Sequence, residues 1–222
     1  MADTFSTRFD QTRMLLVEPE WAGITDQMVA DRNLIEGGNT VLSVDPLSGI
    51  STWQATFQFG LKSHAEMKAF ATWIIQRQGR MESFWLPSWV NDFYLAVDYV
   101  SGTTSLVVSP CWIENLTLFF AADRGTAPIL PWNLGLMIVQ SNENRHFRGI
   151  AGFSIDGFGR PVFTLDQSIA ATFVVGQVER ISLLRRVRVD QDITEIGYDS
   201  DSTGRAQVSF AQVPFEGEDF RP

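Results

Sequence analysis

Apolar and polar residues alternate along residues 51–60. The apolar members are Trp53, Ala55, Phe57 and Phe59, and Thr or Gln residues stand between them. Because successive side chains of a strand point to opposite faces, this period of two places all four apolar residues on one face. The pattern predicts a strand with one buried face.

The next segment changes to a helical period. Ser63 and Glu66 have the spacing of a capping box, in which the Ser hydroxyl accepts from the Glu66 N–H and the Glu carboxylate accepts from the Ser63 N–H. Gly79 can take the left-handed conformation that often ends a helix. These signals predict a helix over residues 63–78, packed on a sheet through one apolar face. That face consists of Met67, Phe70, Ala71 and Ile74.

Most of the remaining chain has the short apolar runs and the Gly, Asn, Asp and Ser turns that are typical of β structure. The predicted strands are 12–18, 40–45, 82–87, 92–99, 105–109, 117–122, 135–140, 146–155, 161–166, 172–177, 179–190 and 205–215.

The spacing of these strands predicts a mainly β protein with two parts. We expect residues 1–103 together with 178–222 to form a β-sandwich or barrel-like domain with one α-helix packed on the sheet. Residues 104–177 read as a small inserted all-β unit.

Composition supports a buried core, since 45% of the 222 residues are hydrophobic and 12% are aromatic. No apolar run approaches the roughly 20 residues that span a bilayer, and no signal-peptide pattern opens the sequence, so we expect neither membrane insertion nor signal-directed secretion. Cys111 is the single cysteine, which excludes an intramolecular disulfide and an all-cysteine metal site. A small buried side chain is the simplest interpretation of Cys111.

The net charge of −9 argues against nucleic-acid binding as a primary role, because phosphate contacts need clustered Lys and Arg. Arg185, Arg186 and Arg188 form the one cluster. In a strand, Arg185 points to one face and the other two point to the opposite face. They either form a solvated or edge-protecting strand face, or pair with acidic groups of a neighbouring subunit.

No motif points to catalysis, a cofactor or a metal. His64 and His146 lack a metal-ligand spacing, and the sequence around Ser154 lacks the second glycine of a nucleophile elbow. Residues 199–204 begin like a calcium loop, but Phe210 stands at its twelfth position, where a Glu is required. We therefore expect no enzyme activity, although a pair of carboxylates that meet only in space, as in glycosidases, stays open.

Aromatic residues crowd the segment 84–94, which includes Trp85 and Trp89, and Trp112 and Trp132 follow. Core filling is the simplest interpretation, and an interface or a sugar-stacking surface is the alternative.

Four features together resemble a known family. The strand of residues 51–60 is followed by a helix ending in "RQGR", by the junction "GRMESFWLP" and by a closing segment that runs from "RRVRVD" to "VSFAQVP". This arrangement resembles the distal tail proteins of long-tailed bacteriophages. The resemblance covers about residues 50–100 and 180–215.

The resemblance implies a structural virion protein that forms a ring, hexameric in that family, between the tail tube and the tail tip or baseplate hub. Its partners would be copies of itself, the tail tube protein, tail tip or hub proteins and the tape measure protein. It would be assembled in the bacterial host cytoplasm and reside at the tail tip. The residues expected at subunit contacts are Arg185, Arg186, Arg188, Trp85 and Trp89.

Two alternatives stay open. The first is a neighbouring hub or tail-completion subunit. The second is a carbohydrate-binding or glycan-hydrolysing tail component that uses Trp112 or Trp132.

Overall fold

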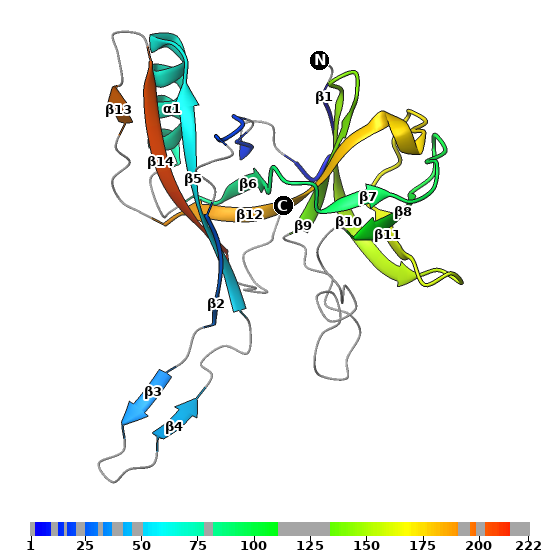
Figure 1. The fold of residues 1–222 in the computed structure, drawn as a ribbon, viewed down its shortest axis with the longest axis horizontal. Helices are drawn as coiled ribbons and strands as arrows, with labels where there is room; N and C mark the ends of the chain where they lie inside the picture. Colours follow the sequence, from blue (N-terminus) through cyan, green and yellow to red (C-terminus); the bar gives the residue numbers. More distant parts are fainter. Residues whose placement is uncertain are drawn as a thin grey trace. The chain divides into compact units, whose positions relative to one another are not determined.

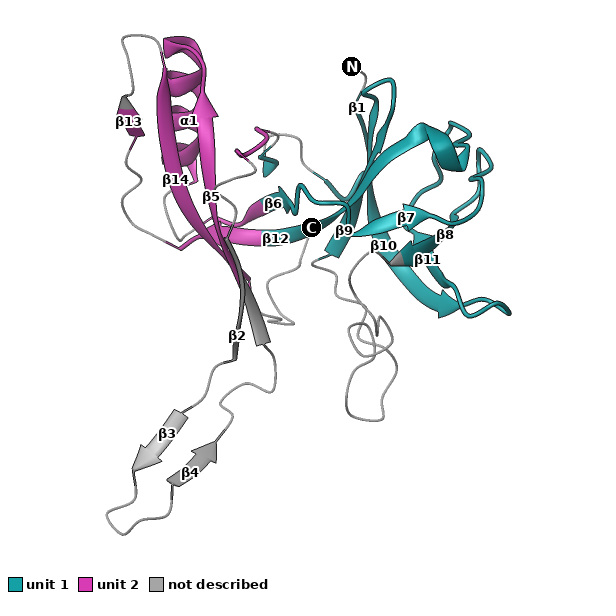
Figure 2. Ribbon diagram, viewed as in Figure 1, with its two compact units in different colours: residues 1–16, 85–186 teal, residues 17–84, 187–222 magenta. Residues whose placement is uncertain are grey.

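The structure is a computed structural model, and it confirms the predicted mainly β class with one α-helix packed on a sheet (Figure 1). The chain forms two compact units (Figure 2): unit 1 comprises residues 1–16 and 85–186, and unit 2 comprises residues 17–84 and 187–222. The residues described are 3–9, 13–15, 17–20, 25–30, 33–36, 42–45, 51–77, 82–110, 134–190, 196–198 and 203–213.

The boundaries of these units differ from the predicted ones, which lie at residues 104 and 178. Strand β7 (Phe93–Leu95) pairs with β8 (Ser105–Pro110), and the first part of β12 (Val178–Val189) pairs with β9 (Leu134–Gln140). Segments on both sides of the expected insert therefore share hydrogen bonds with it and belong to unit 1.

Unit 1 contains a closed ring of six antiparallel strands, completed by β10 (Arg145–Ile155) and β11 (Pro161–Leu165). Around the ring the order is β7, β8, β11, β10, β9 and β12, and Ile181 of β12 pairs with Phe93 to return to β7. A register shift between Ile150 and Gly152 lets β10 pass from β9 to β11. The enclosed core includes Leu95, Leu106, Val108, Leu136, Ile138, Phe163 and Leu183.

Three smaller elements complete unit 1. Strand β1 (Asp3–Phe5) pairs in parallel with β10, and its Phe5 ring stacks on Phe147 at a centroid distance of 4.5 Å. Strand β6 (Phe84–Pro87), whose first residue belongs to unit 2, pairs with β12. A 3-10 turn, η3 (Val175–Gln177), leads into β12.

Unit 2 is built on an antiparallel sheet in which β5 (Ser51–Leu61) lies between β2 (Thr25–Ala30) and β14 (Gly204–Gln212). The end of β12 and β13 (Ile196–Tyr198) also pair with β14, and β3 (Asn33–Glu36) pairs with β4 (Leu42–Asp45). The period of two in β5 has its predicted effect. Ala55, Phe57 and Phe59 are buried, whereas Gln54, Thr56 and Gln58 are half-buried.

Helix α1 (His64–Gln76) packs its predicted face on this sheet. Met67, Phe70 and Ile74 are buried, and the Phe70 ring lies 5.1 Å from the Phe59 ring between centroids. The Ser63 hydroxyl accepts from the Glu66 N–H at 3.2 Å as expected. The reciprocal half of the capping box was wrong, because the Glu66 carboxylate accepts from the Lys62 N–H at 2.7 Å.

Three predicted strands differ from the structure or lie outside its described part. In 12–18, the described residue Met14 makes an isolated bridge to Trp85. In 172–177, Phe173 makes an isolated bridge to Tyr99, and the 3-10 turn η3 begins at Val175. The predicted strand 117–122 and Gly79 lie outside the described residues.

Candidate subunit interface

The three arginines predicted at subunit contacts lie in very different surroundings along β12. Arg185 is buried, Arg186 is half-buried and Arg188 is exposed. All five residues from Ile181 to Arg185 are buried, so both faces of the strand are covered there, and beyond this point burial alternates with the strand period. Arg186 and Arg188 are therefore the two arginines of this cluster that offer surface to a partner.

Trp89 is completely buried and lies in a loop that is hydrogen-bonded to β12. Its backbone has φ of 60°, a left-handed conformation that is strained for a bulky residue. Neighbouring hydrogen bonds hold the loop: the Ser88 N–H donates to the Leu183 carbonyl at 2.8 Å, and the Leu183 N–H donates to the Asp92 carboxylate at 2.7 Å. Arg180 donates to the Trp89 carbonyl at 3.0 Å and lies over its ring. Trp89 thus fills the interior of unit 1.

Trp85 is also buried. The Phe9 ring meets it edge to face at a centroid distance of 4.7 Å, and the Arg8 guanidinium carbon lies 5.7 Å from its ring centroid. In this chain, both tryptophans of the predicted interface are core residues. Trp112, Trp132 and Cys111 lie outside the described residues.

Sequence reasoning missed a polar network that ties the N-terminal segment to β10 and β11. Asp166 accepts hydrogen bonds from the Ser6 hydroxyl at 2.7 Å and from the Gly149 N–H at 2.9 Å. Burial lowers the pKa of Arg8, and the positive charge of Arg186 lowers this pKa further. The negative charge of Asp166 raises it in part. Arg186 therefore lies close enough to Arg8 for their charges to interact, although the two residues are 178 positions apart in the sequence. Neither periodicity nor a sequence motif predicts a contact over such a separation.

The two histidines belong to different units and have different surroundings. His146 is buried in unit 1, between the Thr4 hydroxyl and the Gln140 side-chain oxygen, and His64 is exposed at the start of α1 in unit 2. Burial, assisted by the charge of Arg148, lowers the pKa of His146 to about 4, so its ring is neutral at pH 7. Among the same residues, no three His, Cys, Asp or Glu side chains gather as metal ligands would.

Along β12, Arg186 and Arg188 thus keep accessible side-chain surface, whereas Arg185 does not. No protein-family model matches the chain, and no curated protein matches it. Of the helices in the described ranges, none has the length and apolar character needed to cross a membrane.

Proposed function

We propose that this protein is a structural component of a bacteriophage tail, and that it forms a ring joining the tail tube to the tail tip or hub. The observation that carries the proposal is the strand, helix and return strand of residues 51–87. The segment that bears the family resemblance folds as β5, α1 and β6, with the apolar face of α1 packed on the sheet.

The sheet face opposite α1 supports this role. It carries polar, partly exposed side chains in cross-strand register: Gln58 lies opposite Gln207, and the hydroxyls of Thr56 and Ser209 hydrogen-bond at 2.8 Å. An ordered polar sheet face suits a contact with another protein, because its groups can exchange water for hydrogen bonds across the interface.

The proposed partners are copies of the chain itself, the tail tube protein, tail tip or hub proteins and the tape measure protein. The proposed location is the tail tip of the virion, after assembly in the host cytoplasm. Arg186 and Arg188 would pair with acidic groups of the adjacent copy, which a protein of net charge −9 supplies in excess.

Sedimentation velocity and negative-stain electron microscopy of the purified chain test the proposal. We expect a single oligomer of defined mass and closed rings in the images. A chain that stays monomeric at every accessible concentration would overturn the ring. Hydrolysis of a bacterial surface glycan by the purified chain would overturn the structural role.

A further inference from the structure

Strand β14 ends directly beside the arginines of β12. Its last residue, Gln212, lies opposite Val187, so the next residue, Val213, comes level with Arg186. The pairing does not extend further in the same way, because Pro214 has no N–H to donate and the preceding part of β12 is paired with β9. The ladder between β12 and β14 therefore stops next to Arg186.

Arg186 has other positive charges around it. It shares the outward face of β12 with Arg188, because the intervening Val187 is buried. Arg8 lies close enough for its charge and that of Arg186 to repel each other, and Asp166 is the carboxylate that counteracts this at Arg8. A further carboxylate placed beside Arg186 would be attracted by all three arginines.

The sequence that follows Val213 is acidic. Residues 214–222, which lie outside the described residues, contain one basic and three acidic side chains, and the three are Glu216, Glu218 and Asp219. A short acidic run alone is common on protein surfaces, but the attachment point distinguishes this one. Because an extended chain covers about 3.5 Å per residue at most, Glu216 stays within about 10 Å of Val213.

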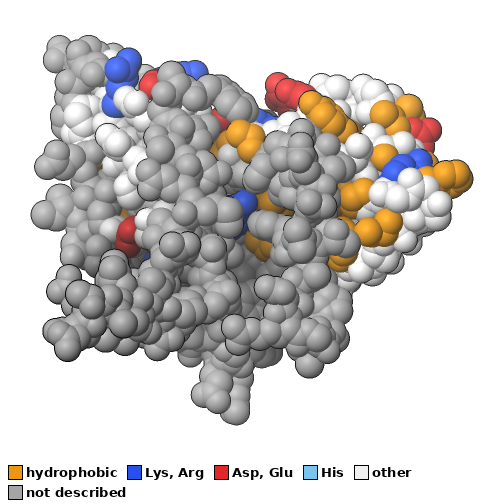
Figure 3. Space-filling view, turned by 60° about the horizontal axis from the view of Figure 1, so that its bottom comes forward, with side chains coloured by type: hydrophobic (Ala, Val, Ile, Leu, Met, Phe, Trp, Pro, Cys, Tyr) orange, Lys and Arg blue, Asp and Glu red, His pale blue; other side chains and the backbone are white. Residues whose placement is uncertain are grey.

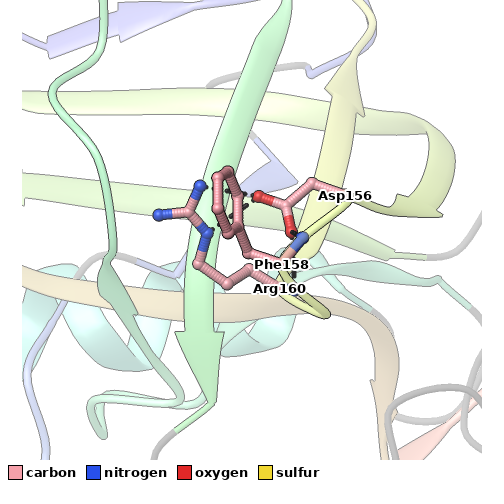
Figure 4. Close-up of polar contacts among 3 residues, drawn as sticks. All are labelled: Asp156, Phe158 and Arg160. Atoms are coloured by element: carbon pink, nitrogen blue, oxygen red, sulfur yellow. Dashed lines mark hydrogen bonds and ion pairs between the residues drawn. The ribbon is translucent and has the colours of Figure 1, made fainter.

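Basic side chains elsewhere on the described surface are sparse or satisfied. On the face of the molecule shown in Figure 3, the described Lys and Arg side chains lie in small separate groups. In the turn between β10 and β11, Arg160 is paired with its own neighbour (Figure 4). Asp156 accepts a hydrogen bond from the Arg160 side chain, and their ion-pair distance is 2.7 Å. Arg160 is therefore a suitable control for an arginine whose charge is balanced locally.

We propose that the acidic segment 214–222 docks on Arg186 of its own chain, with Arg8 and Arg188 beside it, and masks these arginines until a neighbouring copy displaces it. The inference rests on the proposed ring function, because it describes how the arginine contact of the ring is regulated. The short tether favours the segment of the same chain over that of a second copy. It holds the carboxylates near the arginines at an effective concentration of about 1 mM.

Masking opposes ring formation in dilute solution. If the segment alone binds the arginines with a Kd of about 0.1 mM, an effective concentration of about 1 mM weakens a competing subunit contact by about 10-fold. In an assembled ring, the larger area of a complete subunit interface outweighs this single contact. Neutralising the segment should therefore strengthen self-association, whereas removing the arginines should weaken it.

Crosslinking tests the contact without requiring a ring. In the Arg186→Lys variant, a carbodiimide joins the introduced amine to a carboxylate in direct contact with it, and mass spectrometry of the monomer identifies that carboxylate. We expect crosslinks to the acidic residues of segment 214–222. The matched control, Arg160→Lys, should crosslink to Asp156 and not to the segment.

A mixture of isotope-labelled and unlabelled Arg186→Lys chains shows whether the two ends of a crosslink belong to one chain. We expect every crosslink to join residues of the same isotope composition, because the segment docks on its own chain. Circular dichroism of each variant shows whether the fold is kept.

Sedimentation equilibrium tests the masking. The variant that combines Glu216→Gln, Glu218→Gln and Asp219→Asn should self-associate about 10-fold more tightly than wild type. Its control changes the net charge equally at three exposed acidic residues of unit 1, by Asp3→Asn, Glu143→Gln and Glu179→Gln. The control should associate as wild type does.

The outcomes separate this inference from the function on which it rests. If Arg186→Lys gave no crosslink to the segment while Arg160→Lys crosslinked to Asp156, the docking would be overturned and the ring function would stand. Crosslinks between labelled and unlabelled chains, or weaker association of the neutralised variant, would assign the segment to a second copy and overturn the proposal. A wild-type chain that never oligomerises would overturn the ring function and the masking role, while crosslinks within one chain would still establish the docking.

Discussion

The imidazole Nδ1 of His146 lies 2.6 Å from the hydroxyl oxygen of Thr4, and this contact joins β10 to the N-terminal strand β1. On the other side of the ring, Nε2 lies 3.3 Å from the Gln140 side-chain oxygen, which can only accept. Nε2 therefore carries the proton, and Nδ1 accepts from the Thr4 hydroxyl. Both ring nitrogens of the neutral imidazole therefore have a hydrogen-bond partner.

This relationship predicts that the chain loses stability as the pH falls from about 6.5 towards 4. The pKa of His146 is lowered from 6.5 to about 4 in the folded chain by burial, with a contribution from Arg148. Between these values the unfolded state binds the proton and the folded state does not, so protonation favours unfolding. We expect a loss of up to about 3 kcal/mol from this residue.

Urea unfolding of wild type and His146→Gln across this pH range measures the effect. Carboxylates titrate in both proteins and change the free energy of unfolding of both. The difference between the two proteins in the slope of this free energy against pH therefore isolates the contribution of the histidine. The wild type should lose more of its free energy of unfolding than the variant as the pH falls. Identical slopes would show that His146 titrates normally.

Phe70→Ala should destabilise the chain by about 3–5 kcal/mol, because it removes a buried ring and leaves a cavity between α1 and the sheet. Lys68→Ala, two positions earlier on the exposed face of α1, should change the free energy of unfolding by no more than about 0.5 kcal/mol. Denaturant titration compares the two. Equal effects would contradict the packing of this helix face.

Gly135→Ala should destabilise unit 1 by about 1–3 kcal/mol through overpacking. A Cβ at this position of β9 would lie 2.6 Å from the Phe9 ring and 2.9 Å from the Arg148 carbonyl oxygen, and the backbone atom has little room to move. Gly157→Ala is the matched control, since nothing lies within 4 Å of its added Cβ. If thermal melting gave both variants the same midpoint, the close approach at Gly135 would be excluded.

Replacing Arg186 and Arg188 together by Ala should weaken ring assembly while the fold stays intact. Truncating one partner of a desolvated ion pair at an interface costs about 2–5 kcal/mol, because the other charge is left unpaired. Arg205→Ala is the control: this exposed side chain lies 3.8 Å from Glu20, in a surface pair of small energetic value. Sedimentation and circular dichroism provide the two measurements, with tail completion in a complementation assay as the functional one. Normal rings from the double variant would remove these arginines from the interface.

The sequence by itself determined some local elements of this protein, above all β5 and α1, whereas β1, β2, β3 and β13 carried no pattern from which they were predicted. The period of two in β5 and the period of three to four in α1 specify which side chains share a face, and Ser63 marks where the helix begins. These features depend on neighbours a few residues apart. For that reason the mainly β class, the buried face of α1 and the alternation of Arg186 and Arg188 with buried valines could be predicted.

Only the tertiary structure decided which strands pair and what becomes buried. The closure of six strands in unit 1 joins β12 to β7 and β9, and this draws residues on both sides of the predicted insert into one unit. Arg185 and Trp89 are buried in the folded chain, although their residue types are also frequent at interfaces. The contact of His146 with Thr4 spans 142 positions. Periodicity specifies the face on which a side chain lies, but the partner that covers that face depends on the packing of the whole chain.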